Sequence, residues 1–412
     1  MENVENEYYE RFKGGKNMIR HLLKLTWNRK KKNFILGIEI LISFMVLFAV
    51  FSVGVDFFIN YIKDRGFEYE KVYSVNLDWQ NESNKVIQQK KEQIISLLSQ
   101  YTEIENFSFA TNNVPYSNSQ WTTGFKYGSG EIHADIFYTD DMFLDVLEIK
   151  PTSGSKFSKE FDANKLVPVI INRKFAEELA DNKPTIGKKI MEGGPEDSKK
   201  EYLVVGTFEH YKYQNDFTET ENQVFVRTNR LDTVTNLSTI LLKMKTATSA
   251  VFEQKLVSDL SKISPNWTFD VTLLKENRAS VNREVLAPFL IFTIVAGFLI
   301  FNVALGIFGV LWYSINRRRP EIGLRRAMGA TSALIKKQFI GEMWMLTSLS
   351  LVIGIVLAVQ FPLIGVFNVK PMIYVQSIVL SVLFIFLLVT LCAYKPSSMA
   401  AKMQPADTLR EE

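Results

Sequence analysis

The chain has 412 residues, a hydrophobic content of 47% and a formal net charge of only +4, which gives no indication of nucleic-acid binding. Its one cysteine, Cys392, leaves no disulfide framework or Cys-based zinc site, and three scattered histidines argue against a His-rich metal site. The mean hydropathy is +0.02 although several stretches are almost wholly apolar. Polar segments therefore balance apolar ones, as in a membrane protein that carries a soluble domain.

Residues 1–33 predict an amphipathic helix before the first apolar stretch. Over Met18–Trp27 the apolar residues share one face, and Arg20, His21 and Lys24 lie on the other. A helix of this kind lies in the membrane interface and leads into the following span.

Four segments are long and apolar enough to cross the hydrocarbon core, which takes a helix of about 20 mostly apolar residues. They are residues 34–62, 284–316, 338–366 and 371–394. The predicted fold is therefore membrane α-helical, with four transmembrane helices and one large polar region between the first two.

The positions of Lys and Arg predict the orientation of these spans. Cations gather just before the first span, at residues 29–32, and between the second and third, at residues 317–337, whereas the connection between the third and fourth holds only Lys370. Because positive flanks stay in the cytoplasm, we expect both termini, including the tail 395–412, to be cytoplasmic and residues 63–283 to lie outside.

Residues 63–283 predict a mixed α/β extracytoplasmic domain. Lys71–Trp79 alternates like a strand, and Val86–Tyr101 has the apolar spacing of an amphipathic helix. A strand–helix–strand pattern recurs over residues 238–274, after a more β-rich middle. This order indicates two subdomains, one inserted in the other.

The Arg-rich loop predicts a short helix joined rigidly to two spans. Pro320 suits the first helical turn. Gly329 suits the C-terminal end of that helix, and Thr331 or Ser332 suits the N-cap of the third span. Such an element could pass a push from a cytoplasmic partner into the membrane.

A known family matches these residues. The run Arg318–Ala330, R-R-P-E-I-G-L-R-R-A-M-G-A, resembles the R-R-x-E-I-G-x-R-R-A-x-G-A signature of MacB/FtsX-like ABC transporter permeases. Gln338, Phe339 and Glu342 resemble the family's Q-F-x-x-E at the start of the third span.

Two further regions carry the resemblance. The tail Lys395–Arg410 is similar to the family's P-A-x-x-A-x-x-x-P-x-x-A-L-R ending and keeps the helix-breaking Pro396, but it has Ser397 and Thr408 where Ala is usual. In the outer region, VPVIINRKFAEEL, IGKKI and YLVVGTF are similar to the family's extracytoplasmic core. The resemblance covers nearly the whole chain and implies a four-span permease subunit without a fused ATPase domain.

In this family the short cytoplasmic helix docks on the ATPase, so the resemblance assigns coupling to a run of consecutive residues. They are Glu321, Ile322, Gly323, Leu324, Arg325, Arg326, Ala327, Met328, Gly329 and Ala330. The sequence contains no G-x-x-x-x-G-K-[ST] P-loop and no LSGGQ-like stretch. We therefore expect no catalytic residue, metal or cofactor in this chain, and expect ATP and Mg²⁺ in a separate ATPase.

Three polar residues inside the spans are candidate intramembrane contacts: Glu39, Asn302 and Glu342. An ionised carboxylate costs about 2.5–3.5 kcal/mol at the bilayer centre, so it usually faces protein. For both glutamates two interpretations stay open: an interfacial side chain that snorkels or meets a cation such as Lys30–Lys32, or a contact between spans. Asn302 is a candidate for a hydrogen bond across a dimer interface.

The leading hypothesis from the resemblance is a bacterial inner-membrane, multi-pass permease. It would couple ATP hydrolysis to movements of the outer domain, by mechanotransmission, and so drive export or extraction of a peptide, drug or lipoprotein-type substrate. The expected partners are a cytoplasmic ABC ATPase, a second permease subunit, an extracytoplasmic adaptor or substrate protein, and the lipid bilayer. The alternatives are an FtsX-like regulator that acts on an outer partner enzyme without transport, and a receptor without an ATPase.

Overall fold

The computed structural model describes residues 30–127, 130–163, 165–180, 184–193, 200–246, 250–366 and 369–403. The predicted amphipathic helix at Met18–Trp27 and the last residues of the tail lie outside this part of the chain. The chain forms two compact units. We call Met1–Phe58 with Ala287–Glu412 the helical unit, and Ile59–Leu286 the α/β domain.

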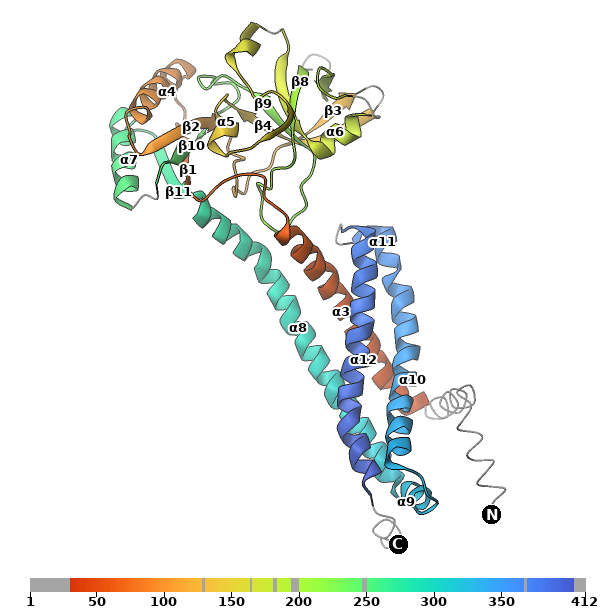
Figure 1. The fold of residues 1–412 in the computed structure, drawn as a ribbon. Helices are drawn as coiled ribbons and strands as arrows, with labels where there is room; N and C mark the ends of the chain where they lie inside the picture. The colour runs from red at the N-terminus through yellow and green to blue at the C-terminus, as the bar shows by residue number, and fades with distance from the viewer. Residues whose placement is uncertain are drawn as a thin grey trace. The chain divides into compact units, whose positions relative to one another are not determined.

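The helical unit contains the larger part of each of the four helices that are long and apolar enough to span a membrane, which confirms the predicted fold class. They are α3 (Lys30–Ile62), α8 (Leu274–Arg317), α10 (Ser332–Ala358) and α12 (Pro371–Ala401). The short helices α9 (Arg319–Ala327) and α11 (Gln360–Ile364) flank α10. Side chains from all four long helices meet in one apolar cluster, and α10 and α12 run side by side in Figure 1.

Two helices extend past their predicted spans. Helix α8 begins at Leu274 and has 44 residues, about 66 Å at 1.5 Å per residue, roughly twice the hydrocarbon thickness. Helix α12 continues to Ala401, so the prediction that Pro396 breaks this helix was wrong. Proline removes only one backbone donor and kinks a helix without necessarily ending it, and Ser397 Oγ donates to Ala393 O at 2.7 Å in the same turn.

The first subdomain of the α/β domain is a four-stranded antiparallel sheet covered by two helices. Its elements are β1 (Val72–Asp78), α4 (Asn84–Leu98), β2 (Ile104–Ala110), β10 (Thr239–Met244), α7 (Ala250–Ile263) and β11 (Thr268–Leu273). The strand order β11-β1-β10-β2 is that of two interlocked strand–helix–strand units. Helices α4 and α7 lie together on one face of the sheet in Figure 1 and share its apolar core.

The second subdomain is inserted between β2 and β10, as predicted, and its strands close into a ring. The ring order β3-β4-β9-β6-β8-β7 returns to β3, and β5 pairs with β8. Its strands are β3 (Thr122–Tyr127), β4 (Gly130–Thr139), β5 (Pro151–Gly154), β6 (Val167–Asn172), β7 (Lys189–Glu192), β8 (Glu201–Phe208) and β9 (Gln223–Arg227). Its short helices are α5 (Phe143–Val146), the 3-10 helix η1 (Lys159–Ala163) and α6 (Arg173–Ala180).

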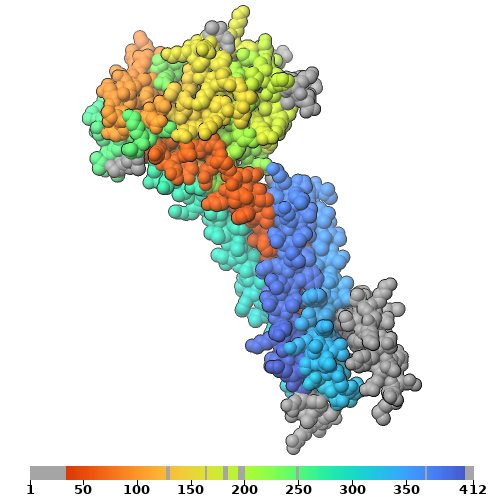
Figure 2. Space-filling model, viewed as in Figure 1, coloured from red at the N-terminus to blue at the C-terminus, as the bar shows by residue number. Residues whose placement is uncertain are grey.

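The two subdomains form one continuous sheet. Strand β2 meets β4 through the pair Ala110 and Thr139. In the space-filling view of Figure 2, the orange segment that contains α4 lies directly beside the yellow segments of the strand ring.

Lys91 of α4 is fully buried in the first subdomain. Its ammonium lies 5.0 Å from the centre of the Trp79 ring and donates to Asp232 O at 3.0 Å. Burial lowers the pKa of Lys91 from 10.5 to about 8. Between these two pH values the unfolded chain binds more protons than the folded one, so stability rises with pH across this window.

We therefore expect Lys91→Met to be more stable than wild type at pH 7, and to lose that advantage as the pH rises from 8 to 10.5. Across this pH range the free energy of unfolding of wild type should rise by up to about 3 kcal/mol. Thermal unfolding of the full chain, followed by tryptophan fluorescence at several pH values, measures it. The matched control is Lys126→Met, because Lys126 is exposed. An unchanged pH dependence in Lys91→Met would contradict the assignment.

Candidate functional site

Helix α9 and the start of α10 form a corner whose ends are capped. Gly329 has φ +95°, a conformation that favours glycine. The N–H of Gly329 donates to Arg326 O at 3.1 Å and that of Ala330 to Arg325 O at 2.9 Å, which together make a Schellman motif. Thr331 Oγ1 then accepts from Leu334 N at 3.3 Å and caps α10. The predicted ends of both helices are confirmed.

A chain of polar contacts joins α9 to α10. Glu321 pairs with Arg325 one turn later, and Arg325 Nη1 donates to Gln338 Oε1 at 2.6 Å. Gln338 Nε2 lies 3.3 Å from Glu342 Oε1, which also accepts from Arg318 Nη1 at 2.8 Å. The signature residues before the corner are thus bonded to the Q-F-x-x-E residues after it.

The Arg318–Glu342 ion pair is the buried end of this chain. The two side chains are only 8% and 10% exposed, and the Arg318 guanidinium lies 5.8 Å from the centre of the Phe339 ring. A charge in such a place is stable only while its partner is present. Glu342 therefore meets a cation, and this cation lies at the junction of α8 and α9.

The predicted coupling residues divide into a buried and an exposed face. Ile322 is 3% exposed and Gly323 is buried, so this side packs on the helical unit. Leu324 and Met328 are 54% and 57% exposed, and Ala327 is exposed between them. Their spacing of three and four residues places them on one face of the helix. The structure thus leaves an apolar face on α9.

The remaining candidate contacts have different surroundings. Glu39 lies against α8, because a Cβ built at Gly306 would be 2.7 Å from Glu39 Oε2. The side chains of Lys30–Lys32 lie outside the described residues. Asn302 is exposed and donates to Phe298 O of its own helix at 2.8 Å. Its role across a dimer interface stays a prediction.

A groove of about 510 Å³ lies where the two subdomains of the α/β domain meet. It is lined by aromatic and charged side chains, among them Tyr138, Lys200, Tyr202, Arg227 and Asp232. Among the described residues no group of three or more His, Cys, Asp or Glu side chains is placed to hold a metal ion.

Two family models match the chain. The MacB-like periplasmic core domain matches residues 34–257, more than half of the chain. The chain belongs to the MacB/FtsX-like permease family. The FtsX-like permease C-terminal model matches residues 293–405, which include α9 and the polar contacts described above. The chain is therefore a membrane permease of the MacB/FtsX type of ABC transporter.

Several known proteins are similar to this permease. The uncharacterized ABC transporter permease YknZ of Bacillus subtilis is 24% identical over 295 residues, 70% of this chain and 72% of YknZ. The macrolide export ATP-binding/permease protein MacB of Neisseria meningitidis is 21% identical over 322 residues, 74% of this chain and 47% of that protein. A crystal structure of the periplasmic region of MacB from Actinobacillus actinomycetemcomitans superposes with a TM-score of 0.39 and 13% identity, covering 54% of this chain and 97% of that region.

Proposed function

We propose that this permease couples ATP hydrolysis by a separate cytoplasmic ATPase to movements of its α/β domain outside the membrane. These movements drive export or extraction of a peptide, drug or lipoprotein-type substrate. The positive flanks support a cytoplasmic position for α9 and both termini, which is part of this proposal. The observation that carries the proposal is the α9 corner, which combines an exposed apolar face with a capped, ion-paired attachment to the spans.

The attachment suits the transmission of a displacement. Helix α9 follows α8 at the Arg318 corner and reaches α10 through a short capped turn, so it has little freedom to move alone. The ion pair of Arg318 with Glu342 and the hydrogen bond from Ser332 Oγ to Ala401 O at 2.9 Å tie this corner to α10 and α12. A push on α9 is therefore passed to three spans at once.

The exposed α8 face that carries Asn302 is the place we propose for the second permease subunit. Phe298, Phe301 and Leu305 are each more than half exposed on the same stretch of helix. In a membrane these side chains face lipid or another helix, and an asparagine gains most from a protein partner.

Placing negative charges on the exposed apolar face of α9 tests whether this face binds the ATPase. In the double variant Leu324→Asp and Met328→Asp we expect the amount of ATPase that co-purifies from membranes to fall more than about tenfold, as for central residues of an interface. Both side chains are exposed, so the helical unit itself should keep its stability. Co-purification from detergent-solubilised membranes, quantified against the permease, is the measurement.

The matched control is Val234→Asp with Val251→Asp, two exposed apolar residues of the α/β domain. This control should retain the ATPase. Retention of the ATPase by the α9 variant would move the docking site elsewhere. If no ATPase accompanied the wild-type chain, the transporter would lack its energy source and the receptor hypothesis would replace it.

A further inference from the structure

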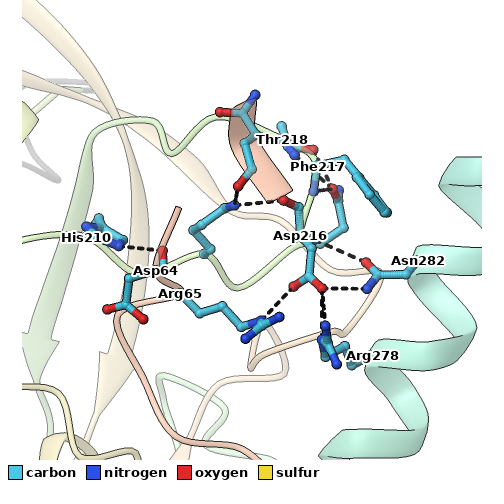
Figure 3. A network of polar contacts seen from close by, with 11 residues as sticks. Asp64, Arg65, His210, Asp216, Phe217, Thr218, Arg278 and Asn282 are labelled. Atoms are coloured by element: carbon cyan, nitrogen blue, oxygen red, sulfur yellow. Dashed lines mark hydrogen bonds and ion pairs between the residues drawn. The ribbon is translucent and has the colours of Figure 1, made fainter. Parts of the chain in front are cut away.

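One buried carboxylate joins three segments of the chain in the α/β domain: the loop after β8, the residues after α3 and the start of α8. Asp216, in the loop after β8, is 1% exposed. It accepts from Arg65 Nε at 3.0 Å, from Arg278 Nε and Nη2 at 2.9 and 2.6 Å, and from Asn282 Nδ2 at 2.8 Å. Arg65 follows α3, whereas Arg278 and Asn282 lie in the first turns of α8. Figure 3 shows these side chains converging on Asp216.

The same loop holds the last turn of α3. The buried Lys212 ammonium donates to Asn60 O at 2.6 Å and to Asp216 O at 2.7 Å, so it caps a carbonyl at the C-terminal end of the helix. The ring of Tyr61, also on α3, stacks on Phe217 with 5.7 Å between centroids. The end of α3 is therefore fixed to the domain by side chains.

The charges of this cluster depend on one another. Burial opposes ionisation of Asp216, but hydrogen bonds from Arg278, Arg65 and Asn282 outweigh it and lower the pKa of this carboxyl. The two guanidiniums also lie 5.4 and 5.1 Å from the centre of the Tyr69 ring. Without Asp216 two partly buried arginines would face each other with no anion between them.

The two helices are connected to the domain in different ways. Strand β11 ends at Leu273 and α8 begins at Leu274, which is buried in the domain core, so α8 is anchored by the chain itself. Helix α3 ends at Ile62, and β1 begins only at Val72. The intervening residues 63–71 form neither helix nor strand.

That linker also contacts the Asp216 loop through its backbone: Arg65 O accepts from Lys212 N at 3.0 Å, and Asp64 O lies 2.7 Å from His210 Nε2. Gly66 has φ +81°, and a Cβ at this position would lie 2.0 Å from His210 O. The backbone of the linker is thus pressed against the loop where a side chain has no room. Side-chain bonds and these linker contacts, rather than a continuous helix or strand, hold α3 to the domain.

We infer that Asp216 is a positioning residue that makes α3 move together with the α/β domain. The inference rests on the proposed function, in which movements of the helices reach that domain. Removing the carboxylate loosens the end of α3, because Arg65 loses its partner and only the Lys212 and Tyr61 contacts and the irregular linker then hold the helix. Helix α8 stays attached, because it continues directly from β11.

Distances between spin labels test this in the full chain, bound to its ATPase in lipid nanodiscs. Cys392, the only cysteine, is replaced by serine. Three label pairs share the exposed Val234 of the α/β domain: the second label is at Phe58 on α3, Ile291 on α8 or Leu363 on α11, all more than 60% exposed. In wild type we expect the Phe58 and Ile291 pairs to give single distributions that ATP does not change.

In Asp216→Ala we expect the Phe58 pair to lose its single distribution while the Ile291 pair keeps it. Arg65→Gln, which removes only the bond from the α3 side, should act in the same way and serves if the alanine variant does not fold. Asp141→Ala, which breaks an ion pair with Arg227 elsewhere in the domain, should change neither pair.

The outcomes separate the inference from the proposed function. A Phe58 distribution that is the same in wild type and in both variants overturns the role of Asp216. Loss of both distributions in Asp216→Ala also overturns it, because the effect would then be general unfolding. A Leu363 pair that does not respond to ATP in wild type overturns the proposed function instead.

Discussion

Glu342→Ala is expected to destabilise the helical unit by about 3–5 kcal/mol, because the change leaves Arg318 as a buried charge without its partner. The side chain of Arg318 is 8% exposed, and among the described residues its Nε and Nη2 atoms already have no hydrogen-bond partner. Its remaining charge compensation comes from Glu342, 2.8 Å away. Unfolding of the detergent-solubilised chain, followed by its helical signal, measures the change.

Two comparisons show whether burial causes this effect. Glu177→Ala breaks an exposed ion pair with Arg173 and should have a much smaller effect, because solvent screens such a pair. The double variant Arg318→Met with Glu342→Leu should recover most of the loss, since an apolar pair of similar volume replaces both charges. A cost for Glu342→Ala no larger than that for Glu177→Ala would show that the pair is solvated.

Gly354→Ala is expected to be the most damaging substitution of a glycine in the spans. A Cβ at this position of α10 would lie 2.5 Å from Cδ1 and 3.0 Å from Cε1 of Phe44 on α3. Phe44 is completely buried and its ring packs on Phe48, so it has no space into which to turn. Overpacking of this kind typically costs about 1–3 kcal/mol, and the same unfolding measurement detects it.

The control for Gly354 is Gly309→Ala in α8, where an added Cβ would have no atom within 4 Å. That change should leave stability unchanged or raise it by less than about 1 kcal/mol, since alanine favours helix. Phe44→Leu in the Gly354→Ala background should restore part of the loss. If the double variant showed no such coupling, the two helices would not meet at this point.

Much of the fold could be predicted because its determinants are local. Each span is encoded by its own apolar residues, and the corner at Gly329 and Thr331 by residues that favour helix ends. The strand–helix–strand units are visible in the periodicity of Val72–Asp78 and Asn84–Leu98. The early start of α8 at Leu274 was missed because its first turns are polar, and hydropathy does not detect a helix without an apolar stretch.

The polar sites could be predicted only in part, because their partners are distant in sequence. Glu342 and Arg318 are separated by 24 residues, and two interpretations of the glutamate stayed open before the structure was known. Asp216 meets Arg65 across 151 residues and Arg278 across 62, and no local pattern marks any of the three. The closed ring of strands depends in the same way on the parallel pairing of β4 with β9.

The chain enters the α/β domain at β1 and leaves it at β11, and these two strands are neighbours. Tyr73, near the start of one, pairs with Leu273, the last residue of the other. An inserted domain whose two ends lie close together can be replaced by another such domain, because the distance between the flanking chain segments stays the same. The α/β domain of a related permease should therefore fit on these membrane helices when it is exchanged at the start of β1 and the end of β11.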